Sequence, residues 1–228
     1  MSDFPDPSGD DAALALAGLP PSTATLARII PDTTARKRPR PGERRVQILQ
    51  TLASMLEQPG ADRITTAALA ARLQVSEAAL YRHFASKAQM FEGLIEFIES
   101  SVFTLVNQIT ERESAGTVQA QRIVVMLLQF GEKNPGMVRV MVGDALVFEH
   151  ERLITRMNQF FDRLEGQLRQ SLRSAADANG SMTPTVDANA LASGLTALMV
   201  GRLQRYARSG FKRQPTEHLD ALLLRLTA

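Results

Sequence analysis

The stretch from Arg63 to Lys87, RITTAALAARLQVSEAALYRHFASK, most strongly limits how this chain can fold. Its pattern predicts two short helices joined by a tight turn. The first helix is expected over Thr66–Leu73, with a threonine at its start as N-cap. The turn is expected at Gln74-Val75-Ser76, because the serine of this turn is a suitable N-cap for a second helix over Glu77–Phe84.

Two short helices with a three-residue turn are the plan of a helix-turn-helix, whose second helix enters the major groove of DNA. An ordinary helical hairpin inside a larger helical domain is the alternative. In the helix-turn-helix interpretation, side chains of the second helix face base edges, while hydroxyls, basic groups and helix N-termini meet phosphate. The candidate DNA-binding residues are Arg44, Thr65, Thr66, Ser76, Glu77, Ala78, Tyr81, Arg82, His83 and Lys87.

The segment VSEAALYRHFASK closely resembles the DNA-binding segment of TetR-type regulators. The shared pattern is Ser-x-x-x-Leu-Tyr-x-His-Phe followed by Ser-Lys, and this chain matches every one of those positions. The resemblance implies that Tyr81 and His83 meet the DNA backbone and that Phe84 packs inward. It also implies that Ser86-Lys87 opens the next helix.

Charge is distributed unevenly along the 228 residues, although the net charge is only +2. Residues 1–35 carry five acids and one base, whereas residues 36–45, RKRPRPGERR, carry six bases and one acid. A basic block directly before a helix-turn-helix suits a phosphate backbone. A solvated linker is the plainer interpretation of the same run. Residues 1–42 as a whole are expected to be a disordered extension, first acidic and then basic.

Several classes of protein are disfavoured by what the sequence lacks. It has no cysteine, so disulfides and thiolate zinc sites are excluded. No apolar run reaches the roughly 18 residues that a membrane span needs. The three histidines have no partners at catalytic spacing, and Glu149-His150-Glu151 is more simply a solvated helix face than a metal cluster. We therefore expect no enzyme activity, no cofactor and no metal.

The rest of the chain predicts an all-α protein with a DNA-binding head at residues 43–90 and a helical body at 91–228. Pro59-Gly60 and Asn134-Pro135-Gly136 are expected to end helices. Ser86 is expected to cap a long helix that bridges head and body, with Gln89 completing a capping box. The helices are expected over residues 43–57, from 87 to about 113, 118–133, 137–146 with a break near Gly143, 149–176, 187–209 and 216–227.

The two long helices at 149–176 and 187–209 are the candidates for a homodimer interface, because a symmetric dimer places two heads on one duplex. Small residues at Gly194, Ala197 and Gly201 would allow close helix packing. The alternative is that both helices only fill the core of the monomer.

The body also resembles a known group, the nucleoid occlusion factors of the TetR type. The runs that carry this resemblance are FGEKNPGMVRVMVGDALVFEHERLITRMNQFFDRLEGQLRQ and RYARSGFKRQPTEHLDA, together with the head and the start of the long helix. The resemblance implies a cytoplasmic, nucleoid-associated protein that binds palindromic sites on double-stranded DNA. It further implies that the bound protein engages the division GTPase FtsZ and inhibits septum assembly over the nucleoid.

By position, the resemblance implies an FtsZ-binding surface on the body. Leu105 and Gln129 stand where that group has an arginine and a glycine, so the strength of the contact stays open. For Phe97 and Met126, plain core packing is the alternative. A ligand-responsive transcriptional repressor with the same head is the alternative function. The implied surface consists of Phe97, Leu105, Met126, Gln129, Lys133 and Asn134.

Overall fold

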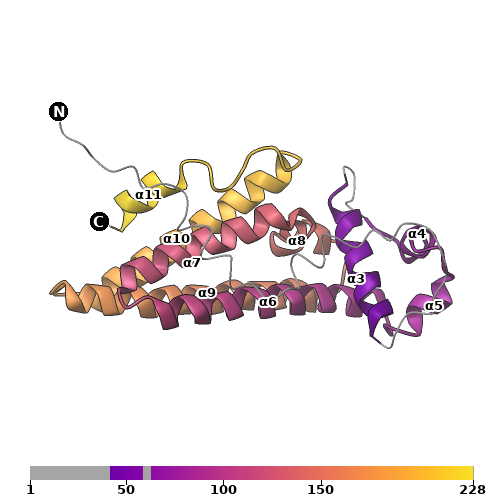
Figure 1. The fold of residues 1–228 in the computed structure, drawn as a ribbon, viewed down its shortest axis with the longest axis horizontal. Coiled ribbons are helices and arrows are strands. Elements are labelled where there is room, and N and C mark those ends of the chain that lie inside the picture. The colour runs from indigo at the N-terminus through magenta and orange to yellow at the C-terminus, as the bar shows by residue number, and fades with distance from the viewer. Residues whose placement is uncertain (1–41, 59–62, 228) are drawn as a thin grey trace. The chain divides into compact units, whose positions relative to one another are not determined.

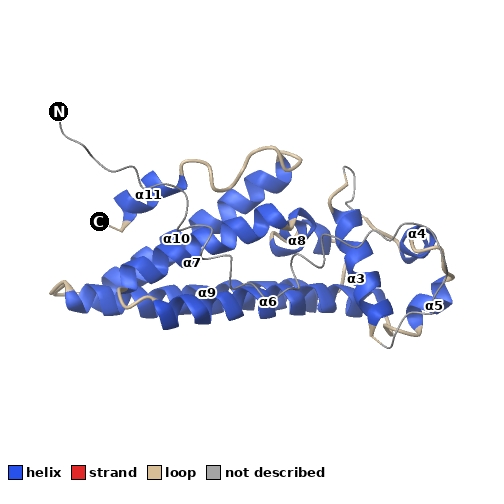
Figure 2. Cartoon of the chain, in the orientation of Figure 1, coloured by secondary structure: helices blue, strands red, loops and turns tan. Residues whose placement is uncertain are grey.

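The structure, a computed structural model, describes residues 42–58 and 63–227. These residues form helices joined by turns and loops, with no strand among them (Figure 2). The all-α prediction is therefore confirmed. The expected N-terminal extension up to residue 41 and the helix stop at Pro59-Gly60 lie outside the described residues.

Helices occupy most of the described sequence (Figure 1). In chain order they are α3 (Glu43–Leu56), α4 (Thr66–Arg72), α5 (Glu77–Tyr81), α6 (Lys87–Arg112), α7 (Gly116–Lys133), α8 (Pro135–Met141), the 3₁₀ turn η1 (Asp144–Leu146), α9 (Glu151–Ala178), α10 (Pro184–Arg208) and α11 (Leu219–Leu226). The expected break near Gly143 is confirmed, since this residue has φ +84° between α8 and η1.

Two predicted helices are shorter than expected. The helix of the motif's second half ends at Tyr81 rather than Phe84, because the N–H groups of His83 and Phe84 both bond to Leu80 O in a tightened last turn. The last helix begins at Leu219 rather than Thr216. The Thr216 hydroxyl donates to Glu132 Oε1 at 2.5 Å instead of capping the helix.

Side-chain caps fix the ends of the helices in the head. Thr65 accepts from Ala68 N–H at 3.1 Å, and Ser76 accepts from Ala79 N–H at 3.3 Å. Ser86 accepts from Gln89 N–H at 3.2 Å, as predicted. The reciprocal bond of the capping box differs, because the Gln89 side chain accepts from Ala85 N–H and not from the cap residue itself. The head thus has its turn and its helix starts set by local hydrogen bonds.

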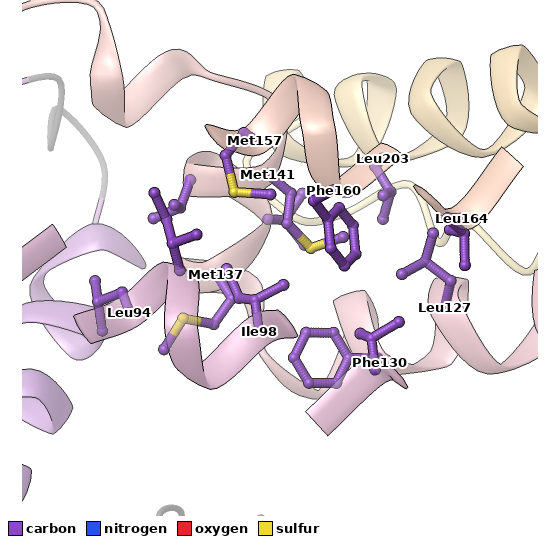
Figure 3. Packing of buried hydrophobic residues seen from close by; sticks show 14 of the residues in the cluster. Leu94, Ile98, Leu127, Phe130, Met137, Met141, Met157, Phe160, Leu164 and Leu203 are labelled. Atoms are coloured by element: carbon purple, nitrogen blue, oxygen red, sulfur yellow. The ribbon is translucent and has the colours of Figure 1, made fainter. Parts of the chain in front are cut away.

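The body packs α6, α7, α9 and α10 around one apolar core (Figure 3). Met137 and Met141 of α8 join Phe160 and Leu164 of α9 there, and all four are buried. Leu203 of α10 closes the cluster. Burial of this many large apolar side chains is the main favourable contribution to folding of the body.

Ion pairs run between α6 and the start of α9. Lys87 pairs with Glu149, Glu92 with Arg152 at 2.8 Å, and Glu99 with Arg156 at 2.6 Å. The partners advance in the same direction along both segments, so α6 and α9 run parallel away from the head. The hydrogen bond with Glu99 raises the pKa of the Arg156 guanidinium.

The head joins the body where α3 meets the N-terminus of α8. A Cβ placed on Gly136 would lie 2.2 Å from Ala53 O, so only a glycine allows the two backbones to approach this closely. Glu57, at the end of α3, accepts a hydrogen bond from the backbone of Gly136. Burial nevertheless raises the pKa of the Glu57 carboxyl, so its ionisation opposes this packing, and its contribution to stability decreases as pH rises through that pKa.

The substitution Gly136→Ala should destabilise the protein by about 1–3 kcal/mol, because α3 and α8 must separate to admit the methyl group. Urea denaturation followed by circular dichroism measures this change. Ser54→Ala, at an exposed position of α3, is the control and should change stability by less than about 0.5 kcal/mol. An unchanged urea midpoint for Gly136→Ala would mean that α3 and α8 can separate enough for the methyl group without loss of stability.

Candidate functional site

The N-termini of the two short helices lie together on the head. Thr66, at the start of α4, donates its hydroxyl hydrogen to Glu77 Oε2 of α5 at 2.6 Å. Thr65 and Ser76 cap these helices, and Ala78 is exposed in the first turn of α5. The structure therefore brings the predicted residues at both helix starts onto one surface, where backbone N–H groups favour an anion.

Three predicted residues at the end of α5 project into solvent. The Tyr81 side chain is 45% exposed, and Arg82 and His83 are also exposed. Within the described residues, the side chains of Tyr81 and Arg82 make no hydrogen bond or ion pair. Both are thus available to a ligand, whereas the buried Phe84 packs inward as the resemblance implied.

Arg45 has a structural connection that the sequence did not reveal. Its Nη1 donates to His83 O at 2.9 Å, and its guanidinium lies 4.1 Å from the centre of the Phe84 ring. The contact ties α3 to the end of α5 and fixes how the second helix is presented. The predicted Arg44, one residue earlier, donates instead to Gln47 Oε1 at 2.7 Å within its own helix. The 38-residue separation of Arg45 and His83 leaves no local sequence signal for the contact.

Lys87, a predicted phosphate ligand, is engaged with the body. Its ammonium pairs with Glu149 and lies 5.6 Å from the centre of the Phe91 ring. The lysine side chain is 23% exposed and that of Glu149 only 10%. A phosphate group would therefore have to compete with, or share, a carboxylate that stands 62 positions away in sequence.

The loop between η1 and α9 meets the head at a second point. The Arg63 guanidinium lies 5.9 Å from the centre of the Phe148 ring, and Phe148 is 66% exposed. The adjacent Glu149 holds Lys87. Sequence analysis assigned no role to Arg63 or to this loop, because both depend on contacts between distant parts of the chain.

The candidate partner surface divides between exposed and buried positions. Phe97 is half-buried, with its ring centre 6.4 Å from that of Phe130. Helical spacing places Met126 and Lys133 near Phe130 on α7, the first half-buried and the second exposed. Gln129 is half-buried on the same helix, next to Phe130 in sequence.

The other two candidates have structural roles. Leu105 of α6 is buried, with only 6% of its surface exposed. Asn134 donates from its side-chain amide to Phe130 O at 2.8 Å and satisfies a carbonyl at the end of α7. Phe97, Met126, Gln129 and Lys133 therefore form the accessible part of the predicted set.

The Glu149-His150-Glu151 run acts as a helix start. His150 Nδ1 accepts from Arg152 N–H at 3.2 Å, and Glu149 is engaged by Lys87. In the part of the chain that the structure describes, no group of three His, Cys, Asp or Glu side chains is arranged to hold a metal ion. None of the helices described there is both long and apolar enough to cross a membrane.

A pair of substitutions tests whether Lys87 contacts phosphate. Lys87→Ala should weaken binding to every DNA sequence and reduce the slope of log affinity against log salt by about one unit. Glu149→Gln should strengthen DNA binding, because it removes the carboxylate that competes with phosphate. Fluorescence anisotropy over a salt series measures both changes, with the exposed Arg225→Ala on α11 as the control. If Lys87→Ala and Glu149→Gln lower thermal stability equally and leave the slope of log affinity against log salt unchanged, Lys87 has only a structural role.

Solved structures share this fold at low sequence identity. PfmR, a TetR-family transcriptional regulator from Thermus thermophilus, matches with a TM-score of 0.65 at 18% identity, over 80% of this chain and 95% of that one. FadR from Bacillus subtilis, solved in complex with stearoyl-CoA, matches with a TM-score of 0.63 at 11% identity, over 80% and 97%. These similarities establish the TetR-like architecture.

Sequence comparisons identify the family. Residues 48–94 match the family of bacterial regulatory proteins of the tetR type, and residues 115–227 match the SlmA-like model described as a tetracyclin repressor-like C-terminal domain. The nucleoid occlusion factor SlmA of Photobacterium profundum is 52% identical over 178 residues, or 78% of this chain and 90% of that protein. The factor of the same name from Aliivibrio fischeri is 50% identical over 191 residues, or 83% and 97%. This chain therefore belongs to the SlmA nucleoid occlusion factors, a group of TetR-type DNA-binding regulators.

Proposed function

We propose that this nucleoid occlusion factor binds palindromic chromosomal sites as a homodimer and, while bound, contacts FtsZ and inhibits Z-ring assembly over the nucleoid. The observation that carries the proposal is the identity of about 50% that extends through the body as well as the head. Its place of action would be the nucleoid. The exposed Tyr81 and Arg82, the two helix N-termini and Lys87 form the DNA-contacting surface.

The homodimer would form through α9 and α10. These two helices pack against each other, and α10 carries small exposed residues at Ala190, Gly194 and Ala197. A Cβ placed on Gly194 or Gly201 would meet no atom within 4 Å in the same chain. The open space beside this stripe suits a second α10, because small residues let two helix backbones approach closely. Symmetry then sets the two heads about one DNA turn, roughly 34 Å, apart.

Ala197→Glu should convert the dimer into a folded monomer, because two carboxylates would be buried at the symmetric contact. Analytical ultracentrifugation measures the oligomeric state, and the affinity for a palindromic duplex should fall by about tenfold or more. Ala221→Glu, at an exposed small position on α11, is the control and should stay dimeric. A dimeric Ala197→Glu protein would exclude this part of α10 from the interface.

The FtsZ contact would use the accessible part of the partner surface. The half-buried ring of Phe97 and the ring of Phe130 beneath it provide an apolar floor, and Lys133 lies exposed at its end. Within the described residues, no carboxylate pairs with Lys133. An apolar floor beside an unpaired cation suits a peptide that is both apolar and acidic. Leu105 adds no charge to this surface, so Lys133 provides its main electrostatic attraction.

Lys133→Glu should leave DNA binding unchanged and weaken FtsZ antagonism by about tenfold or more, because it replaces attraction of an acidic segment by repulsion. FtsZ sedimentation with GTP, in the presence of the variant and its DNA site, measures the effect. Arg225→Glu, an exposed charge reversal on α11, is the control. Phe97→Ala should have the same effect, but its packing against Phe130 also makes it a test of stability.

Full FtsZ antagonism by Lys133→Glu, in a protein that still binds DNA, would remove this surface from the contact. If even the unmodified protein had no effect on FtsZ while bound to DNA, the division role itself would fail. The ligand-responsive repressor would then be the remaining candidate function.

A further inference from the structure

A basic hollow lies where the end of α10 meets the loop that leads to α11. Its volume is about 180 Å³. Three arginines and a histidine line it together with a single carboxylate, so positive charge predominates. The lining residues are Arg202, Arg205, Arg213, Gln214, Pro215, Glu217 and His218.

Arg202 is held rigidly in the wall of this hollow. Its Nη1 donates to Pro215 O at 2.7 Å and to Glu217 O at 2.8 Å, so it fastens the loop over α10. Both bonds use one nitrogen, which leaves the donors on Nε and Nη2. A guanidinium that is already fixed loses little side-chain entropy when it binds a ligand.

Arg205 and Arg213, the other two arginines of the hollow, make no ion pair in the part of the chain that the structure describes. Among residues 42–58 and 63–227, no carboxylate pairs with Arg205 or Arg213. Glu132, which comes from α7 to the same loop, already accepts from the backbone N–H and the hydroxyl of Thr216. The lining carboxylate of Glu217 lies 3.7 Å from the His218 imidazole. Within the described residues, the charges of Arg205 and Arg213 are therefore not neutralised by an ion pair.

The loop around the hollow has an unusual backbone. Phe211 and His218 have φ of +63° and +55°, in the left-handed region that residues other than glycine seldom adopt. Such conformations persist only where surrounding contacts hold them, and they are often found at ligand sites. Here the bonds from Arg202 and to Glu132 supply those contacts, and the left-handed turn at His218 places this side chain in the lining.

The geometry points to a binding site for a small molecule that carries adjacent phosphate groups, with pyrophosphate as its smallest representative. Arg202 would be the fixed donor, and Arg205 and Arg213 would close on the anion from α10 and from the loop. Guanidinium groups bind phosphate oxygens through paired, charge-assisted hydrogen bonds. The small volume and the carboxylate of Glu217 favour a compact ligand over a long polyanion. The site shares α10 with the proposed dimer interface, but its lining includes no residue of the small-residue stripe, of the DNA-contacting surface or of the FtsZ surface.

A purely structural explanation covers part of this cluster. Arg205 and Arg208 lie in the last turns of α10, where cations stabilise the partial negative charge of the helix end. That explanation does not extend to Arg213, which follows the helix and lines the hollow. Arg208 is exposed on the same helix but is not part of the lining, so it provides a matched control.

Isothermal titration calorimetry of the full chain with sodium pyrophosphate at low salt tests the site. The unmodified protein and Arg208→Ala should each bind one pyrophosphate per chain with the same affinity. Arg205→Ala and Arg213→Ala should each weaken binding by about tenfold, since each removes a charge-assisted contact. Thermal denaturation without ligand shows whether each variant remains folded.

Absence of pyrophosphate binding by the unmodified protein would overturn the proposal, as would equal losses in all three variants. A titration with duplex DNA tests whether the arginines bind the DNA backbone instead of a small ligand. If only duplex DNA binds, and Arg213→Ala reduces its salt slope, the arginines contact the DNA backbone and the small-ligand site is excluded. An affinity for pyrophosphate that does not change in Arg205→Ala and Arg213→Ala would place the anion elsewhere.

Discussion

The close backbone contact between α3 and α8 at Gly136 is the constraint on which the relation between head and body depends. It fixes the head against the body at the point where the chain passes from α7 into α8, next to Lys133 and Asn134. Gly136 also donates its backbone N–H to the Glu57 carboxyl, so a hydrogen bond links the first turn of α8 to the end of α3. The elements proposed to contact DNA and the partner are thereby joined through packed backbone rather than through a flexible linker.

Electrostatics add a second connection along α6. The ion pairs with the start of α9 are partly exposed, so each contributes little to stability on its own. The Lys87–Glu149 pair is the most buried of them and holds a residue that is also a predicted phosphate ligand. Some basic residues of the head thus have partners within the protein: Lys87 pairs with Glu149 of the body, and Arg45 bonds to His83 of the head. Arg45 supports α5 from behind, while Arg82 stays unpaired within the described residues.

Each of the three proposed contact sites carries a cation that pairs with no carboxylate among the described residues. Tyr81 and Arg82 face solvent beside two helix N-termini, Lys133 lies beside an aromatic floor, and Arg213 lines a hollow. Several other arginines of the described body, Arg156 among them, are paired with carboxylates. An unpaired cation at the surface lowers protein stability little, but its positive potential attracts an anionic partner to the neighbouring surface or hollow.

The sequence alone determined the helix-turn-helix, the approximate positions of the helices and several of their caps, because these depend on residues three or four positions apart. Ser76 and Ser86 cap the predicted helices, and the family follows from the motif and the body runs. The tertiary structure decided which predicted side chains are accessible: Leu105 is buried, and Lys87 is held by Glu149. It also decided that Arg202 fastens the loop over α10. Such contacts join positions far apart in the chain, and only the packing of complete helices specifies which distant groups meet.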